Sequence, residues 1–318
     1  MFIRALAGSF HWPAMQASTS LMVPDEHLTR VAGVNQALNG VLAIVGPLLG
    51  ALAVEALLMY QVMAIDVGTA VLAIIPLLFV FIPQPKRAAQ GEEKTSIWSD
   101  LAVGFRYVIG WRGLVAIIGA AMIIHLVLTP AFTLLPLLVK NHFGGGAAQL
   151  GFMEGVSGVG MLLGGVILGV WGGFHRRIYT SLIGIIFMGL SLLLLGLTPG
   201  AMFWLALVSA FVMGFVIPFV DGPILAIMQA NVDPDMQARV FTMMGSLLAI
   251  TSPIGLLIAG PLSDWVDIRI WFLASGLACL AAGIGLFFIP SVIHIEDERG
   301  RTTVDESVVA DKTESGTQ

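Results

Sequence analysis

The sequence predicts an all-α, polytopic membrane protein with about nine transmembrane helices, because of its composition, its apolar stretches and its charge distribution. Hydrophobic residues account for 57% of the 318 residues and charged residues for 11%, whereas soluble domains are about half apolar and about a quarter charged. Mean hydropathy is +0.93. Stretches long enough to cross a bilayer, which takes about 20 helical residues, lie at 2–22, 31–57, 61–82, 114–138, 149–173, 179–198, 201–228, 241–262 and 270–291.

Most breaks between these stretches are short, and the longest, "PQPKRAAQGEEKTSIWSD", divides the chain. From Ile97 onward, apolar residues recur at helical spacing with polar residues between them. This amphipathic pattern predicts a short helix along the inner membrane surface. Its apolar stripe consists of Ile97, Trp98, Leu101, Phe105 and Val108. We therefore expect a partial N-terminal half (1–83), a cytoplasmic linker with this helix (84–112), a six-helix C-terminal half (113–291) and a disordered cytoplasmic tail (292–318).

Lysine and arginine predict the orientation, since positive residues near span ends stay on the cytoplasmic side. With the linker cytoplasmic, the opposite side receives only Arg4, Lys140 and Arg269. A multi-pass protein of the inner or plasma membrane, with its carboxyl terminus in the cytoplasm, is expected. The cytoplasmic side receives Arg30, Lys86, Arg87, Lys94, Arg106, Arg112, Arg176, Arg177, Arg239, Arg299, Arg301 and Lys312.

Several classes of function are disfavoured by the sequence. Cys279 is the only cysteine, which excludes an intramolecular disulfide and a cysteine-rich metal cluster. The phosphate-binding, zinc-protease, nucleophile-elbow and dinucleotide-binding motifs are absent, and the loops are too short for a nucleotide domain. A basic patch with aromatic residues, typical of nucleic-acid binding, is also missing. We therefore expect no enzyme activity, no cofactor, no metal and no nucleic-acid partner.

One loop occurs twice, as "VPDEHLTRV" at 23–31 and "VDPDMQARV" at 232–240. The match extends upstream, where "WPAMQAS" and "GPILAIMQA" place Pro13 and Pro223 at similar distances before the arginine. It extends downstream as well, where Gly46, Pro47 and Gly50 have counterparts in Pro253 and Gly255. Two helices and their connecting loop therefore occur twice in the same direction across the membrane, as in one large class of secondary transporters.

The repeat also predicts how much of such an architecture the chain contains. Its second copy supplies the fourth and fifth spans of a six-span half, and its first copy the first and second spans of a three-span half. We therefore expect helices 4–12 of a twelve-helix architecture, without the first three. The first span is polar and contains His11 and Gln16. Such a helix is better suited to the interior of a bundle than to the first helix that inserts into the membrane.

With these motifs the chain resembles a major facilitator superfamily transporter, in the subgroup of macrolide-efflux-type drug exporters and siderophore exporters. The matching segments are "GSFHWPAMQASTSLMVPDEHLTRVAGVNQ", "AIDVGTAVLA" and "MQANVDPDMQARVFTMM" followed by "SPIGLLIAGPLSDWVDIRIWFLASG". Gly46, Pro47 and Gly50 resemble part of the antiporters' glycine-proline motif, which implies a tight, bendable contact between the halves; ordinary helix packing is the alternative.

Charged residues at the predicted cytoplasmic side are candidates for gating. Arg176 and Arg177 in "GVWGGFHRR" resemble the family's signature loop, or serve only as topology anchors. Each repeated loop also carries acids before its arginine, which predicts a charge network that changes with gate closure; a solvated loop is the alternative. These loop residues are Asp25, Glu26 and Arg30 in the first copy and Asp233, Asp235 and Arg239 in the second.

Ionisable groups inside spans are costly and usually functional. Asp221, between Pro218 and Pro223, is the candidate for proton coupling or cation binding. Glu154 is a second carboxylate candidate, with the outer vestibule as its alternative, and His125 is a proton relay or a histidine hydrogen-bonded within the bundle. The remaining cavity candidates are the polar His11, Gln16 and Gln36 and the aromatic Trp12, Phe132, Phe215 and Phe219.

Two functional hypotheses follow. The first is proton-coupled efflux of a small lipophilic or drug-like compound by alternating access, with the lipid bilayer, the substrate and protons or another coupling cation as partners. The second is an N-terminally truncated, nontransporting membrane protein or remnant of such an exporter.

Overall fold

The computed structural model describes residues 15–16, 18–77, 79, 97–263 and 266–297. In these ranges every regular element is a helix. After the short 3-10 helix Asp25–His27, the elements are α2 (Leu28–Ala56), α3 (Met59–Leu77), α4 (Ile97–Gly110), α5 (Arg112–Thr133), α6 (Leu135–Asn141), α7 (Ala147–Trp171), α8 (Arg177–Leu197), α9 (Phe203–Asn231), α10 (Pro234–Ser263), α11 (Arg269–Phe287) and α12 (Pro290–Ile293).

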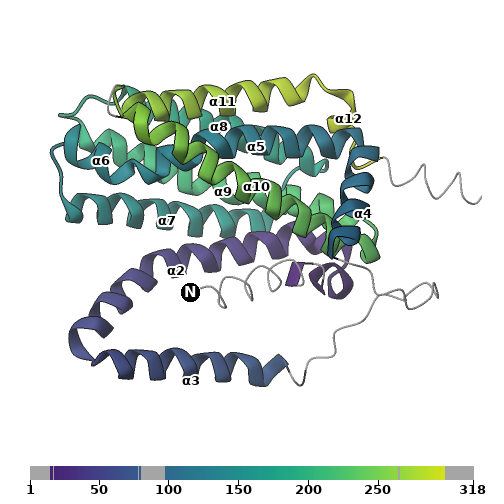
Figure 1. The fold of residues 1–318 in the computed structure, drawn as a ribbon, viewed down its shortest axis with the longest axis horizontal. Helices are drawn as coiled ribbons and strands as arrows, with labels where there is room; N and C mark the ends of the chain where they lie inside the picture. The colour runs from purple at the N-terminus through teal and green to yellow at the C-terminus, as the bar shows by residue number, and fades with distance from the viewer. Residues whose placement is uncertain (1–14, 17, 78, 80–96, 264–265, 298–318) are drawn as a thin grey trace, which may run out of the picture.

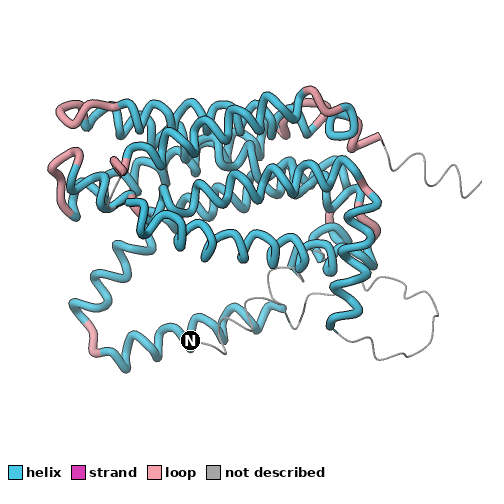
Figure 2. Tube along the Cα trace, turned by 45° about the horizontal axis from the view of Figure 1, so that its top comes forward, coloured by secondary structure: helices cyan, strands magenta, loops and turns pink. Residues whose placement is uncertain are grey.

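The long helices of the C-terminal half lie side by side, and α4 lies across one end of them (Figure 1). The connecting loops gather at the two opposite ends of the bundle (Figure 2). We call these the α4 end, which also holds α12 and the α9–α10 turn, and the α6 end, where α2 joins α3.

Each predicted span from residue 31 onward overlaps a described helix. Seven of these helices are long and apolar enough to cross a membrane. The expected span at 61–82 corresponds to α3, whose apolar core, Tyr60–Ile75, is shorter than the others. The first expected span lies largely outside the described residues, and its described part is helical as far as Met22.

Prolines determine two helix boundaries that differ from the prediction. The expected span 114–138 divides into α5 and α6 at Leu134, because Pro130 lies inside α5 and Pro136 lies in the first turn of α6. Helix α10 begins at Pro234, seven positions before the expected start at 241, since proline suits the first helical turn, where its missing N–H costs nothing. Arg239 therefore lies within a helix rather than in a loop.

Small residues allow the helices of the C-terminal half to approach closely. A methyl group at Gly160 or Gly164 of α7 would overlap the backbone of Phe211 or Phe215 in α9. Helix α8 is the most buried span and packs between α9 and α11, while α5 packs against α10 and α11. Close backbone packing of this kind drives helix association in lipid, where the hydrophobic effect between helices is weak.

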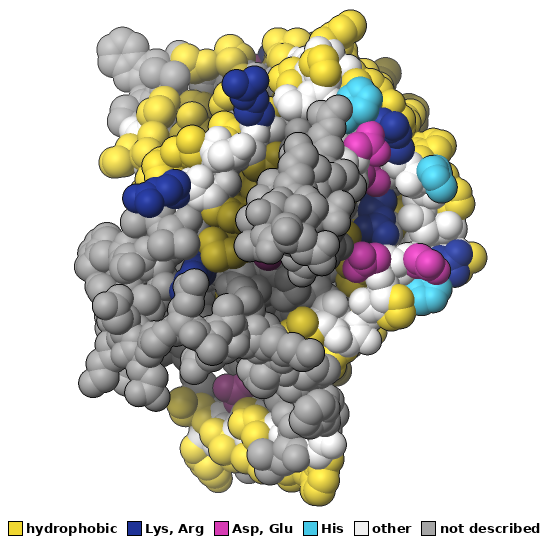
Figure 3. Space-filling view, turned by 90° about the vertical axis from the view of Figure 1, so that its right-hand side faces the viewer, with side chains coloured by type: hydrophobic (Ala, Val, Ile, Leu, Met, Phe, Trp, Pro, Cys, Tyr) yellow, Lys and Arg dark blue, Asp and Glu magenta, His cyan; other side chains and the backbone are white. Residues whose placement is uncertain are grey.

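The two ends of the bundle differ in charge. All the described lysines and arginines of the predicted cytoplasmic side lie at the α4 end, and those of the opposite side, Lys140 and Arg269, lie at the α6 end. Figure 3 looks onto the α4 end, where charged side chains and histidines lie among hydrophobic ones on the described part of the face.

Helix α4 packs against α10 at this end. Gly104 and Val108 are buried, and a methyl group at Gly104 would lie 3.4 Å from the Arg239 Cβ. Phe105, which the sequence places on the same stripe as Val108, is 52% exposed. Gly104 and Val108 therefore form the side of α4 that faces α10, while Phe105 lies on a side that the protein leaves open.

Candidate functional site

The two halves meet along α2 and α7, and the contact depends on glycine. A methyl group at Gly33 would lie 2.9 Å from the Gly169 Cα, and one at Gly40 would lie 2.9 Å from the Leu162 Cα. Both distances are shorter than real carbon contacts, so the two backbones touch without side chains between them. Gly165 closes the same contact from α7, where a methyl group would overlap the backbone of α2.

The contact ends before the helices do. Among the described residues, no atom of another element lies within 4 Å of a methyl group added at Gly46 of α2 or at Gly151 or Gly155 of α7. Leu42 and Leu49 of α2 are 65% and 58% exposed, and α2 diverges from α7 toward the α6 end (Figure 1). In this structure the halves are therefore joined at the α4 end and apart at the α6 end.

Asp221 lies inside α9 and contacts the other half. At 1.5 Å per residue it is about 15 Å from the end of the helix at Asn231. Gln36 of α2 donates a hydrogen bond through its Nε2 to the Asp221 Oδ2 at 3.4 Å. The Gln36 Oε1 in turn accepts one from Asn39 Nδ2 at 3.0 Å, which directs the Gln36 amide group with its N–H toward the carboxylate.

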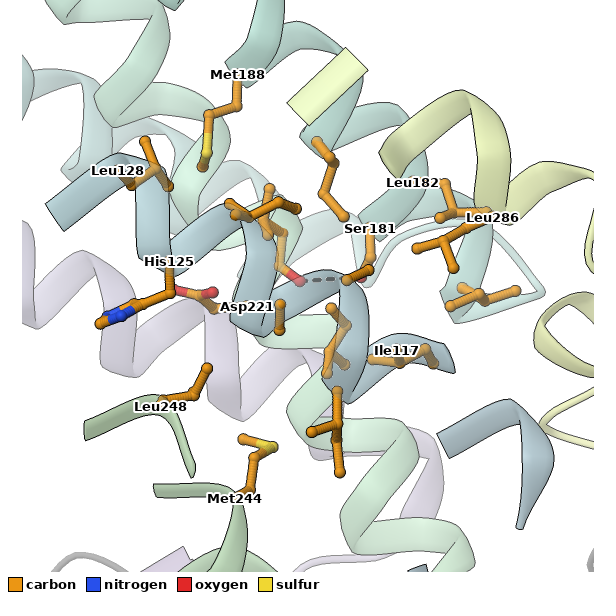
Figure 4. A pocket seen from close by; sticks show the side chains of 18 residues that line it. Ile117, His125, Leu128, Ser181, Leu182, Met188, Asp221, Met244, Leu248 and Leu286 are labelled. Atoms are coloured by element: carbon orange, nitrogen blue, oxygen red, sulfur yellow. Dashed lines mark hydrogen bonds between the residues drawn. The ribbon is translucent and has the colours of Figure 1, made fainter. Parts of the chain in front are cut away.

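Asp221 also lines a mostly apolar cavity of about 220 Å³, shown in Figure 4. All of the residues that line it belong to α5, α8, α9, α10 and α11 of the C-terminal half. Ser181 of α8 donates a hydrogen bond to the Val220 backbone oxygen at 3.0 Å, which ties α8 to α9 beside Asp221. Helix α9 stays continuous through Pro218 and Pro223, so a broken backbone does not form this part of the cavity wall.

His125 lines the same cavity from α5 and is tied to α10. Its Nδ1 lies 3.0 Å from the Thr251 Oγ1 and 3.4 Å from the Thr129 Oγ1. Both hydroxyls donate their hydrogens to backbone oxygens, of Leu248 at 2.7 Å and of His125 itself at 2.8 Å. They therefore accept from the ring, which favours the Nδ1–H tautomer and leaves Nε2 as the acceptor.

The adjacent Arg176 and Arg177 have different partners. Arg176 forms an ion pair with Asp297 at 3.3 Å and donates a hydrogen bond to the Ile293 backbone oxygen at 3.2 Å, both within the C-terminal part. Arg177 donates to the Asp25 backbone oxygen and, at 3.3 Å, to the Ala226 backbone oxygen. Arg177 thus connects the two halves at the α4 end, whereas Arg176 does not.

Gln16 is 7% exposed and hydrogen-bonded to Gln229 of α9. This predicted cavity residue therefore lies in the contact between the halves, at the α4 end. Sequence reasoning named neither Gln229 nor Gln237, which joins the same cluster, nor Thr251 nor Gly33. A signal for Gln229 was present in the Met-Gln-Ala triplet that the two repeats share at 15–17 and 228–230.

The other predicted residues are dispersed. Glu154 is exposed near the start of α7, and Pro253 is exposed in α10, whose close approach to α5 occurs at Gly255 instead.

The predicted loop residues also have separate surroundings. Arg30 contacts α7 near Gly172, and Tyr107 of α4 donates a hydrogen bond to Asp233 at 3.3 Å. Glu26 is exposed in the 3-10 helix. His11 and Trp12 lie outside the described residues, as do the side chains of Pro47 and Asp235 and the surroundings of Gly50.

Two of the predicted aromatic residues pack in the protein. Phe215 forms ring contacts with Phe211 and Phe219, and Phe219 also with Trp171 at the end of α7. These rings fill the α7–α9 contact and are not part of the cavity lining. Phe132 is 41% exposed.

An all-helical membrane bundle with two repeated helix pairs in contact, and with an ionisable group inside a span, has the build of a secondary transporter. The chain belongs to the Major Facilitator Superfamily, whose family model matches residues 1–137 and 117–310. It is 33% identical over 283 residues to Macrolide efflux protein A of Streptococcus pyogenes, covering 88% of this chain and 70% of the relative.

Other relatives carry related names. Macrolide efflux protein A of Enterococcus faecalis is 34% identical over 256 residues, covering 80% of this chain and 79% of the relative. The Multidrug efflux pump Tap of Mycolicibacterium fortuitum is 26% identical over 305 residues, covering 91% and 71%. The chain is therefore a multi-pass membrane protein of a transporter family rather than of an enzyme family.

Proposed function

We propose that this chain is a drug-efflux transporter that exports a lipophilic compound, such as a macrolide, in exchange for protons. The observation that carries the proposal is Asp221, a carboxylate inside α9 that lines an apolar cavity and accepts a hydrogen bond from the opposite half. The names of the relatives support efflux, and the apolar lining supports a lipophilic substrate.

The Asp221–Gln36 contact supports proton coupling. The Gln36 amide offers a donor, and a donor stabilises the ionised carboxylate more than the protonated one. Protonation of Asp221 would therefore weaken this link between α9 and α2. Binding or release of one proton at Asp221 would therefore change the free-energy difference between two arrangements of the halves. Coupling of proton movement to transport requires such a change.

The separation of the halves at one end supports alternating access. The α4 end is closed by glycine contacts and hydrogen bonds, while α2 and α7 diverge toward the α6 end. In the proposed orientation the α4 end is cytoplasmic, so the described arrangement is the one open to the outside. Export requires a second arrangement in which the α4 end opens.

The test is transport by the purified chain in liposomes with an acidic interior, with uptake of a radiolabelled macrolide as the readout. Exchange against protons concentrates the macrolide above the passive level of protein-free liposomes. We expect Asp221→Asn to lose this gradient-driven uptake and to keep exchange of labelled for unlabelled macrolide without a gradient. Asp66→Asn, the same change at an exposed carboxylate of α3, is the matched control and keeps both.

Each outcome decides one part of the proposal. Gradient-driven uptake that persists in Asp221→Asn would remove the proton role of Asp221 and leave efflux intact. A folded chain that moves no macrolide above the passive level, with or without a gradient, would contradict efflux of this substrate class and favour the nontransporting interpretation.

A further inference from the structure

A cluster of uncharged polar side chains joins the two halves at the α4 end. We call it the amide cluster; its members are Gln16, Ser20, Gln229 and Gln237. The three glutamines are 7%, 4% and 1% exposed. Buried amides are uncommon in a membrane bundle, and leaving one without partners is costly, so the hydrogen bonds of this cluster are part of the contact.

Two of its connections cross between the halves. The Gln229 Nε2 donates to the backbone oxygen of Gln16 at 2.9 Å and to the Gln16 Oε1 at 3.1 Å. The hydroxyl of Ser20 donates to the Gln237 Oε1 at 2.5 Å. The two repeats therefore meet at this end, and the glutamine of one Met-Gln-Ala triplet is bonded to the glutamine of the other.

The remaining bonds hold the α9–α10 turn. The Gln237 Nε2 donates to the backbone oxygens of Gln229 at 2.8 Å and of Val232 at 3.0 Å. Helix ends leave their last carbonyls without helical partners, and Gln237 satisfies two of these at the end of α9. The side chain that fixes the turn is thus also the acceptor for Ser20, so the turn and the contact between the halves are coupled.

We infer that the amide cluster is the latch of the α4 end, and that Gln229 and Ser20 are the positioning residues whose bonds break when this end opens. The inference rests on the alternating access of the proposed function. Neutral amide bonds suit a reversible latch, because each shifts an equilibrium by only about two- to twelvefold. A buried ion pair would leave an uncompensated charge when it is broken.

The chain offers a direct reporter of opening. Cys279 is the only cysteine and is fully buried in α11. Ala226 is also fully buried and packs with Leu28 in the contact between the halves. In an Ala226→Cys variant, labelling by a small maleimide in detergent measures opening of the α4 end, while labelling of Cys279 reports unfolding.

The deciding comparison is between two amides of α9. Gln229→Met removes the bonds to Gln16 and keeps the length of the side chain. Asn231→Leu is the matched control, since its amide bonds only to the Ile227 backbone oxygen of its own helix, at 3.0 Å. We expect Gln229→Met to raise the labelling rate at position 226 about two- to twelvefold, with Cys279 still unlabelled, and Asn231→Leu to leave the rate unchanged.

A second variant keeps the test decisive if Gln229→Met does not fold. Ser20→Ala removes the hydroxyl that donates to Gln237 and should raise the labelling rate by a similar factor. Unchanged rates in both variants would overturn the latch, and equal increases at position 226 and Cys279 would assign the amides to stability of the fold. Labelling needs neither substrate nor proton gradient, so this result is independent of whether transport is observed.

Discussion

Gly33 of α2 and Gly169 of α7 lie backbone to backbone across the contact between the two halves. A methyl group on Gly33 would be 2.9 Å from the Gly169 Cα. Since neither residue has a side chain to move aside, the contact tolerates substitution poorly.

The first prediction concerns this contact. Gly33→Ala is expected to lower the free energy of unfolding by about 1–3 kcal/mol, the usual cost of overpacking, and to lower the Tm in detergent. Gly46→Ala is the control in the same helix, because no atom lies within 4 Å of its added methyl group. Equal Tm values for the two variants would show that the α2–α7 contact is looser than described.

The second prediction separates the two arginines at the start of α8. Arg177→Gln loses hydrogen bonds to Asp25 and Ala226, and bonds from a charged donor contribute about 1.5–3 kcal/mol. We expect a lower Tm and faster maleimide labelling of the Ala226→Cys reporter. Arg176→Gln breaks a surface ion pair worth about 0–1 kcal/mol and one hydrogen bond within the C-terminal half, so it should lower the Tm less and leave the labelling rate unchanged. A larger effect from Arg176→Gln would contradict the division of roles.

The third prediction concerns the ring of His125. Thr251→Val keeps the shape of Thr251, which is 5% exposed, but removes the hydroxyl 3.0 Å from the His125 Nδ1. The expected cost is about 0.5–1.5 kcal/mol, the usual contribution of one hydrogen bond, because the Thr129 hydroxyl 3.4 Å from the same nitrogen remains; it is measured as a lower Tm. Thr251→Ser should restore most of the loss. Thr133→Val removes an exposed hydroxyl of α5 and should have no measurable effect.

The fourth prediction concerns Cys279. Its side chain is fully buried in the core that α11 shares with α8 and α9. We therefore expect no reaction with a membrane-impermeant maleimide in the folded protein, and complete reaction after denaturation. Labelling of the native protein at a rate near that of a free thiol would show that α11 is packed less tightly than described.

Much of the fold could be predicted from the sequence, because span length and apolar composition depend on the bilayer rather than on neighbouring helices. The spans at 179–198 and 201–228 correspond to α8 and α9. The contact of Gly104 with α10 could not be predicted, because a glycine in a short amphipathic helix gives no sign of which neighbouring helix it will face.

The candidate site was predicted in part. Asp221 was identified because an ionisable group inside a membrane span is energetically costly and usually functional. Gln36 was identified because it is a polar residue in an apolar span. Their contact joins residues 185 positions apart in the sequence, which periodicity along a single helix does not reveal. Gln237 was missed because a glutamine in a polar turn looks solvated until the opposite half covers it.

The sequence by itself determined that this chain spans the membrane, and it assigned the described basic residues to two groups that lie at opposite ends of the bundle. These properties follow from local composition and from the energy of transfer into lipid. Only the tertiary structure decided which glycines bring α2 and α7 together, that Arg177 rather than Arg176 joins the halves, and that the repeated glutamines bond to each other. Those features depend on which helices become neighbours, and close packing between helices has no single pattern in the linear sequence.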